Sequence, residues 1–392
     1  METKTYDTSE KKERIILVAV ATSDSDDTEQ SLDELEELGQ TAGAETVAKV
    51  IQNRERVHSA TYIGKGKIEE VRELVRTLHA DTVVCDDELS PAQYHNLEEA
   101  LDVKVIDRTV MILDIFAKRA STSEGKLQVE LAQLRYRSSH LVGGRSELSR
   151  LGGGIGTRGP GEQKLEMDRR LIKGRITQVK KELEQVKRTR ELTRKKRQEN
   201  TVPIVAIVGY TNAGKSTLLN RLTDAGILAE DKLFATLDPT TRKFTLPGGS
   251  QILLTDTVGF IRNLPHQVVR AFKSTLDEAV YADILVIICD ASDPEHLTQL
   301  EVTENTLGEL GAGDKPTLIV FNKCDLGASG VARFGSVRPE NICYISAKTG
   351  QGIESFTEKL ENIILNGKTR ETFIIPSSRK NLLISPEIIG TA

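Results

Sequence analysis

Apolar residues follow two different spacings along the chain, and each spacing predicts a different kind of structure. Up to residue 108, apolar runs of strand length at Ile15 to Val20, Val47 to Ile51 and Thr82 to Cys85 alternate with stretches of helical spacing. Parallel strands need a crossover between them, and here each gap is long enough to hold a helix. This part is therefore predicted to be a parallel sheet with helices on its faces.

The helices between these strands are predicted from their period and their first residues. One is expected to begin after a cap at Ser31 and to bury one face, formed by Leu32, Leu35 and Leu38. Another runs from Ile68 to Leu78, with these residues turned inward: Ile68, Val71, Leu74, Val75 and Leu78. Ser90 and Pro91 open a third helix, because serine is a preferred cap and proline fits the first turn.

From Val110 to Arg197 the strand pattern disappears and helical spacing continues in two stripes. The first stripe is formed by Leu127, Leu131 and Leu134, and the second by Leu165, Ile172, Ile176, Val179, Leu183 and Val186. The second has the spacing of a helix-helix seam. Between the stripes, residues 143–161 are too rich in glycine for a regular element. Two antiparallel helices joined by a long loop are predicted.

After Thr201 the alternation of strand and helix resumes and continues to Leu365. The last segment is too short for a core of its own. We therefore expect an α/β protein with four parts: an N-terminal α/β domain at 1–108, a two-helix arm with a Gly/Arg-rich loop at 109–199, a third α/β domain at 200–366, and a short appendage at 367–392.

Composition places the chain among folded, soluble proteins. Of its 392 residues, 38% are hydrophobic and 28% are charged, which is far from the composition of a disordered chain. The four cysteines, Cys85, Cys289, Cys324 and Cys343, lack the spacing of a zinc site or a disulfide framework. We find no leader-like start and no apolar run of membrane-spanning length. A cytoplasmic, monomeric protein is expected.

The net charge of −5 is unevenly distributed, and this asymmetry indicates a partner. Between Lys173 and Arg197 there are 11 Lys and Arg against 3 Glu. Arginines also interrupt the loop at 143–161, where glycines let the backbone approach a phosphate closely. RNA contact through this loop and the basic helix at 164–197 is therefore predicted. A solvated helix face and a plain linker are the alternatives.

One motif indicates a phosphate-binding loop: Gly209 to Ser216 reads G-x-x-x-x-G-K-S. It follows the apolar run Ile204 to Val208 and precedes a helix through Leu218, Leu219 and Leu222. Its backbone N–H groups and the helix N-terminus would hold phosphates. Lys215 would reach the β- and γ-phosphates, and the hydroxyl of Ser216 would bind Mg²⁺. The strand before it and the helix after it make this motif specific.

Three further motifs follow in the order of a guanine-nucleotide site. Asp256 to Gly259 comes after a strand at Ile252 to Thr255; the aspartate would act on the Mg²⁺ shell through water, and Gly259 N–H on the γ-phosphate. Asn322 to Asp325 follows a strand at Thr317 to Phe321. The carboxylate of Asp325 can accept two N–H bonds that guanine offers and adenine does not. Ser346 to Lys348, after Ile342 to Ile345, would support the base.

The segment 234–242 supplies the remaining ligand, a threonine for Mg²⁺ and the γ-phosphate. Thr236 is preferred because Pro239 suits a loop that returns into a strand at Lys243 to Leu246; Thr240 and Thr241 are competitors. Phe260 follows Gly259, where a glutamine could have oriented the attacking water. Hydrolysis is therefore expected to be slow alone and accelerated by a partner.

Longer motifs give a family resemblance. They are Ser90 to Gln93, Leu113 to Phe116, Gly125 to Leu131, Gly152 to Glu162 with Leu165-Glu166 and Asp168 to Arg170, and Phe234 to Thr241. Together with the nucleotide motifs, over about residues 15 to 365, they resemble the HflX family. The resemblance implies a GTPase that binds the large ribosomal subunit and its rRNA, places the arm near the peptidyl-transferase region, and splits stalled or idle ribosomes.

The expected cofactors are GTP or GDP and Mg²⁺. Catalytic roles are expected for Lys215, Thr236 and Gly259, and metal ligation for Ser216 and Thr236. The expected nucleotide-binding residues are Gly209, Tyr210, Thr211, Asn212, Ala213, Gly214, Lys215, Ser216, Thr217, Phe234, Ala235, Thr236, Leu237, Asp238, Asp256, Thr257, Val258, Gly259, Asn322, Lys323, Cys324, Asp325, Ser346, Ala347 and Lys348.

Two other functions remain open from the sequence. The chain could be a regulator that binds RNA or the ribosome and uses GTP only as a timer. It could also be an RNA-remodelling ATPase that works through the N-terminal sheet, as the resemblance allows. That part has no G-x-x-x-x-G-K; Gly64 to Lys67 is read only as a glycine-lysine turn.

Overall fold

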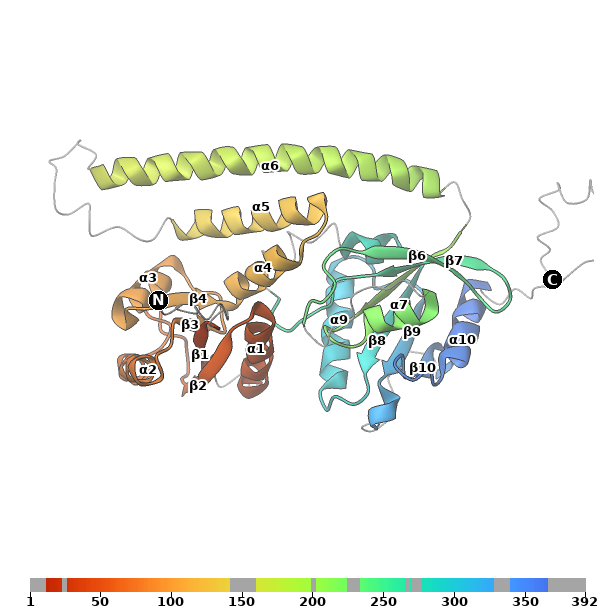
Figure 1. The fold of residues 1–392 in the computed structure, drawn as a ribbon, viewed down its shortest axis with the longest axis horizontal. Helices are drawn as coiled ribbons and strands as arrows, with labels where there is room; N and C mark the ends of the chain where they lie inside the picture. The colour runs from red at the N-terminus through yellow and green to blue at the C-terminus, as the bar shows by residue number, and fades with distance from the viewer. Residues whose placement is uncertain are drawn as a thin grey trace, which may run out of the picture.

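The structure is a computed structural model of the chain. It describes residues 12–22, 27–141, 160–198, 202–223, 233–264, 268, 276–327 and 339–365. The expected appendage at 367–392 and most of the expected Gly/Arg-rich loop lie outside these ranges. The fold is mixed α/β, with an N-terminal parallel sheet, a helical middle region and a second sheet (Figure 1), which confirms the predicted fold class.

The N-terminal sheet has four parallel strands in the order β2-β1-β3-β4. They are β1 (Arg14–Ala21), β2 (Glu45–Asn53), β3 (Thr82–Cys85) and β4 (Lys104–Asp107). The three predicted strands are confirmed, and β4 was not predicted. Helices α1 (Thr28–Ala42) and α4 (Arg108–Arg119) pack on one face, and α2 (Lys65–Leu78) and α3 (Pro91–Leu101) pack on the other.

Helix starts in this domain confirm one prediction and correct two. Ser90 caps α3, and its hydroxyl accepts a hydrogen bond from Gln93 N. Ser31 is not a cap, because α1 already begins at Thr28. Its buried hydroxyl instead donates to Asp86 Oδ2 at 2.7 Å, which holds it inside the first turn of the helix. The expected turn at Gly64 to Lys67 is also wrong, since only Gly64 precedes α2 and the other three residues begin the helix.

Two long helices form the arm. Helices α5 (Ser123–His140) and α6 (Pro160–Gln198) run antiparallel and side by side (Figure 1). Val179 of the predicted seam is fully buried. The loop predicted at 143–161 needs one correction, because Pro160 and Gly161 are the first residues of α6. Proline is tolerated there because the N–H it lacks would have had no partner within the helix.

Helix α5 also holds the arm to the N-terminal sheet. Its second face, with Val129, Ala132 and Tyr136, belongs to the same apolar core as Phe116 of α4. Tyr136 donates its hydroxyl to Asp107 Oδ2 at 2.6 Å, at the carboxyl end of β4. The root of the arm is therefore fixed on the N-terminal domain over most of the length of α5.

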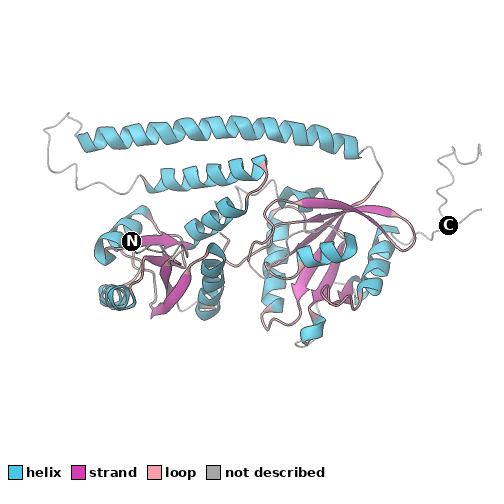
Figure 2. Cartoon of the chain, in the orientation of Figure 1, coloured by secondary structure: helices cyan, strands magenta, loops and turns pink. Residues whose placement is uncertain are grey.

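The second sheet has six strands in the order β10-β9-β8-β5-β7-β6, and only β6 is antiparallel to its neighbour. Figure 2 shows the strands of both sheets in magenta and the helices beside them in cyan. The strands are β5 (Ile204–Gly209), β6 (Thr240–Thr245), β7 (Gln251–Asp256), β8 (Ile284–Asp290), β9 (Thr317–Asn322) and β10 (Ile342–Tyr344). Strand β6 begins three residues before its predicted start at Lys243. Helices α7 (Lys215–Thr223), α9 (His296–Glu309) and α10 (Ile353–Leu365) accompany the sheet.

The two sheets are joined by one continuous apolar core. Phe234, Leu237 and Phe260 of the second domain belong to the same buried cluster as Ile15 and Phe116 of the first. The segments before β6 and after β7, which carry these residues, therefore lie between the two domains, where both can contact them.

Among the described helices, none has a window apolar and long enough to cross a bilayer.

Candidate nucleotide site

The loop from Gly209 to Ser216 turns directly from β5 into α7. Gly214 has a φ of +96°, which is a left-handed conformation, and a Cβ there would collide with the Asn322 side chain. Inside the loop, Lys215 Nζ donates to the carbonyl oxygens of Gly209 at 3.2 Å and Tyr210 at 2.7 Å. The sequence folds in this way because a glycine stands at the position that requires positive φ. The result is a cradle of backbone N–H groups at a helix N-terminus.

Lys215 and Asp256 are two buried groups of opposite charge at the centre of this cradle. Burial lowers the pKa of Lys215 to about 8, and the nearby carboxylate of Asp256 opposes this shift. Burial also raises the pKa of Asp256, against the effect of Lys215 and of hydrogen bonds from Ser216 and Thr236. Each group thus stabilises the charged form of the other in a site from which water is largely excluded.

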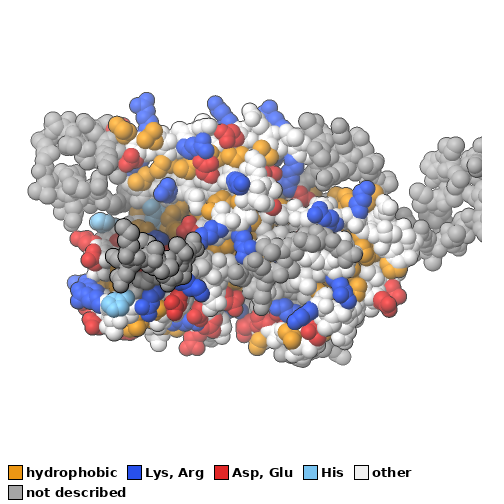
Figure 3. Space-filling model, viewed as in Figure 1, with side chains coloured by type: hydrophobic (Ala, Val, Ile, Leu, Met, Phe, Trp, Pro, Cys, Tyr) orange, Lys and Arg blue, Asp and Glu red, His pale blue; other side chains and the backbone are white. Residues whose placement is uncertain are grey.

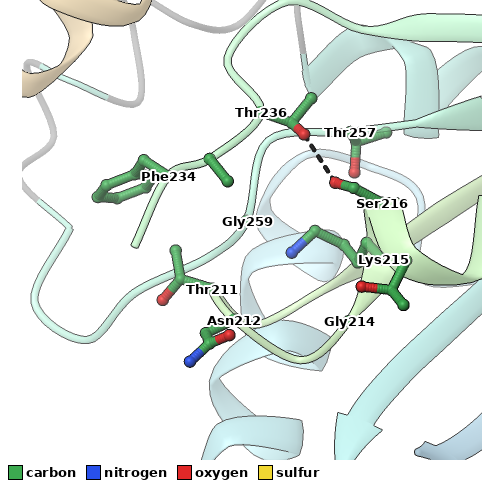
Figure 4. A pocket seen from close by; sticks show the side chains of 11 residues that line it. Thr211, Asn212, Gly214, Lys215, Ser216, Phe234, Thr236, Thr257 and Gly259 are labelled. Carbon is green, nitrogen blue, oxygen red and sulfur yellow. Dashed lines mark hydrogen bonds between the residues drawn. The ribbon is translucent and has the colours of Figure 1, made fainter. Parts of the chain in front are cut away.

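Three oxygen-bearing side chains meet beside Lys215. Ser216 Oγ lies 2.8 Å from Thr236 Oγ1 (Figure 4). It also lies 2.7 Å from Asp256 Oδ2. Thr236 Oγ1 also donates to Asp256 Oδ2 at 3.0 Å, while Asp256 Oδ1 is buried with no hydrogen-bond partner. Thr240 is instead the first residue of β6, where it pairs with Asp256 across the strands. The geometry therefore favours Thr236 over Thr240 as the partner of Ser216. Oxygen donors grouped in this way suit Mg²⁺.

Gly259 lies against Lys215 and the phosphate loop. A Cβ at this position would be 2.8 Å from Lys215 Nζ and 2.8 Å from Thr211 Cα, so no larger residue fits. The next residue, Phe260, is 1% exposed and belongs to the core. Its N–H donates to Gly209 O at 3.1 Å, and its carbonyl accepts from Thr211 N at 2.8 Å. Phe260 thus fixes the backbone of this segment but offers no polar side chain to the pocket.

One pocket collects most of the predicted phosphate-side residues (Figure 4). It is lined by Thr211, Asn212, Gly214, Lys215, Ser216, Thr217, Phe234, Ala235, Thr236, Thr257 and Gly259. Other predicted residues do not line it: Gly209, Tyr210, Ala213, Leu237, Asp238, Asp256 and Val258. Two of these still contact a residue that lines the pocket, because the carbonyl oxygens of Gly209 and Tyr210 accept hydrogen bonds from Lys215.

The two loops predicted to hold the base are tied to each other and to the phosphate loop by one side chain. Asn322 Nδ2 donates to Ala213 O at 2.8 Å, and its Oδ1 accepts from Ala347 N at 2.9 Å. Lys323 pairs with Asp290 at 2.7 Å. At the surface, the next turn, η1 (Cys324–Leu326), leaves the side chain of Asp325 exposed.

The remaining predicted base-side residues surround this turn. Ser346 is buried and accepts from Thr349 N at 3.1 Å, whereas Lys348 is exposed. Cys324 is half-buried, and its N–H donates to Ile345 O at 3.2 Å. The buried members therefore shape the two loops, and the exposed ones are available to a ligand.

Residues of the N-terminal domain that sequence reasoning missed also contact these loops. Glu34 of α1 accepts from the Tyr210 hydroxyl at 2.7 Å and from Arg262 N at 3.2 Å. Burial raises the pKa of Glu34, and the charge of Arg108 opposes that rise. Arg108 itself donates to Arg262 O at 3.4 Å. No local pattern marks Glu34, which lies 176 residues from Tyr210.

Three family descriptions match successive parts of the chain. Residues 29–117 match "GTP-binding GTPase N-terminal", residues 119–197 match "GTP-binding GTPase Middle Region", and residues 204–323 match "50S ribosome-binding GTPase". These matches cover the N-terminal sheet, the arm and most of the second sheet in turn.

Similar proteins agree with these descriptions. A "GTPase HflX" of Lacrimispora saccharolytica is 64% identical over 366 residues, covering 93% of this chain and 86% of that protein. The "GTPase HflX" of Escherichia coli is 43% identical over 379 residues, covering 96% and 89%. A solved structure described as "SsGBP and GDP complex" is 25% identical with a TM-score of 0.49, covering 90% of this chain and 99% of that one.

Proposed function

The chain belongs to the HflX family of GTPases, and on this premise we propose that it binds the large ribosomal subunit and splits stalled or idle ribosomes in a GTP-dependent way. The observation that carries the proposal is the match of residues 204–323 to a ribosome-binding GTPase. GTP hydrolysis is the activity of the family. The ribosomal target and the splitting step are what we add.

The exposed face of α6 supports a nucleic-acid partner. Among the side chains of α6 that the structure describes, these cations are exposed to solvent: Arg170, Lys173, Lys180, Lys181, Lys187 and Arg188. In Figure 3, blue side chains project along the edge of the molecule where Figure 1 places α6. Basic residues along one helix face are suited to contact an RNA backbone. The loop before α6, which is outside the described residues, is proposed to contact rRNA as well.

We propose that the residues expected at the site bind the nucleotide or take part in its hydrolysis. Lys215 and the loop N–H groups hold the phosphates, and Asp325 reads the guanine base. Ser216 and Thr236 hold Mg²⁺, which neutralises charge on the β- and γ-phosphates when it is bound. Gly259 offers its N–H to the γ-phosphate, because no side chain separates it from Lys215.

Hydrolysis by the free protein is expected to be slow, because the buried Phe260 cannot orient water. Large ribosomal subunits should raise the turnover of GTP by at least about tenfold, since a partner can order the nucleotide loops or supply a missing group. Phosphate release should be measured with and without subunits, at equal protein concentration. Equal rates in the two reactions would contradict this expectation.

Splitting is tested by sedimentation of intact 70S ribosomes with the full chain and a non-hydrolysable GTP analogue. Free subunits are expected with the analogue, and an intact 70S peak with GDP. The double variant Lys180→Glu/Lys181→Glu should bind nucleotide normally and split poorly. Arg56→Glu/Arg76→Glu, the same charge change at exposed sites on the N-terminal domain, is the matched control. An unchanged 70S peak with the analogue would refute the proposal.

A further inference from the structure

The segment that carries Thr236 is held at both ends by helices outside its own domain. On the N-terminal side, the Phe234 ring packs edge-on against Phe116 of α4, with ring centroids 4.7 Å apart. Figure 4 shows the Phe234 ring pointing away from Lys215 and Ser216. On the C-terminal side, Asp238 reaches the junction of α4 and α5. Thr236 therefore lies in a short segment that is held at Phe234 by the N-terminal domain and at Asp238 by the start of the arm.

The carboxylate of Asp238 accepts four hydrogen bonds from Ser121 and Thr122. Its Oδ2 accepts from Ser121 N at 2.9 Å, Ser121 Oγ at 2.6 Å and Thr122 N at 2.8 Å, and its Oδ1 accepts from Thr122 Oγ1 at 2.5 Å. Burial alone would raise the pKa of Asp238, but these hydrogen bonds outweigh it and hold the pKa below its ordinary value. The carboxylate also lies at the positive end of the α5 dipole. All of these contacts favour the ionised form.

Two neighbouring features show how closely the anchor is fitted. A Cβ at Gly125 would lie 2.6 Å from Asp238 Oδ1, so only glycine leaves room for the carboxylate. Thr122 is the cap of α5, and its hydroxyl oxygen accepts from Gly125 N at 3.0 Å while donating to Asp238. The aspartate thus contacts the cap of α5 and the residue before it. It does not contact the nucleotide pocket, which Leu237 and Asp238 do not line.

We propose that Asp238 is a positioning residue for GTP hydrolysis: bound to Ser121 and Thr122, it holds Thr236 beside Ser216 and couples the nucleotide to the root of the arm. This inference rests on the Mg²⁺ role proposed for Thr236. Only Leu237 separates Thr236 from Asp238, so neither can move far without the other. A ligand that requires Thr236 at the metal therefore stabilises the anchor, and by linkage the anchor strengthens the binding of that ligand.

The coupling predicts a difference between two nucleotides. In Asp238→Asn, one accepting oxygen becomes an amide N–H₂ that faces donors on Ser121 and Thr122. The variant should bind a non-hydrolysable GTP analogue about tenfold more weakly, with Mg²⁺ present, and should bind GDP within about twofold of the parent. A merely structural role would weaken both nucleotides together. Asp314→Asn, at an exposed aspartate before β9, is the control and should change neither affinity.

A double-mutant cycle locates the coupling. Ser121→Ala removes one donor and leaves the helix cap at Thr122 intact, so it should weaken analogue binding in the parent and have little effect in Asp238→Asn. Additive effects would overturn the proposal. Hydrogen exchange gives an independent measure: the amides of Ser121 and Thr122 should exchange more slowly with the analogue than with GDP, and this difference should disappear in Asp238→Asn.

Thr236→Ala separates the inference from the function on which it rests. If Thr236→Ala weakens analogue binding but Asp238→Asn does not, the anchor is wrong and the metal role of Thr236 stands. If neither variant distinguishes the analogue from GDP, the metal role of Thr236 fails, and the coupling fails with it. Both measurements use the full chain without ribosomes, so they do not depend on the splitting activity.

Discussion

The substitution Asp325→Asn is expected to lower the affinity for GTP by at least about 100-fold, because the carboxylate that accepts two guanine N–H groups loses one acceptor. The new amide N–H₂ would also face the N–H₂ of guanine, placing donor against donor. Xanthosine triphosphate has an oxygen at that position and should bind more tightly to the variant than to the parent. Titrations of both proteins with GTP and with xanthosine triphosphate measure this change in base preference.

The surroundings of Asp325 make this substitution a clean test of base recognition. Its side chain is exposed, whereas the loop is held by buried Asn322 through bonds to Ala213 and Ala347, so the fold should survive. Asp314→Asn, the same change at an exposed aspartate before β9, is the control and should keep the preference for guanine. Unchanged GTP affinity without any gain for xanthosine triphosphate would show that Asp325 does not read the base.

The substitution Arg108→Ala should lower the free energy of unfolding by about 3–5 kcal/mol, because it leaves buried carboxylates without their cation. Arg108 is 1% exposed and donates to Asp86 Oδ1 at 3.0 and 2.6 Å and to Ser31 O at 2.8 Å. It also reaches Glu34 Oε1 at 3.4 Å. Denaturant titration of the full chain measures the change.

An exposed arginine provides the comparison for Arg108. Arg188 forms an ion pair with Glu184 on α6, and its side chain is 75% exposed, against 2% for Arg108 in its pair with Asp86. Arg188→Ala should therefore change the unfolding midpoint very little. If both variants unfold at the same denaturant concentration as the parent, the buried network is not a source of stability. Because Arg108 also bonds Arg262 O, GTP turnover should be recorded in parallel.

Much of the fold follows from local patterns. The three predicted strands of the first sheet and the helices between them are present, because apolar runs of strand length differ clearly from helical spacing. Strand β4 was missed because it has only four residues, of which two are charged. The cap at Ser31 was misplaced because a serine in the first turn looks like a cap, and here Asp86, from another strand end, determines its role.

The nucleotide loops were predictable for a related reason. Each motif is contiguous and follows a strand, and parallel strands bring their carboxyl ends to one edge of the sheet. The preference for Thr236 over Thr240 rested only on the position of Pro239, because both threonines belong to the same contiguous segment. The choice between them depends on where β6 begins, and that start is set by pairing of Thr240 with Asp256 in β7.

The order of motifs predicted a guanine-nucleotide site, and the apolar runs predicted the two sheets, because the conformations involved are dictated by neighbouring residues. Only tertiary structure could connect Asp238 to Ser121 across 117 residues, or Tyr210 to Glu34 across 176. Such contacts arise where two separately patterned domains meet, and nothing in the local sequence specifies which polar groups will face each other there. The phosphate loop is thus a local property of this chain, whereas its connection to the arm exists only in the folded molecule.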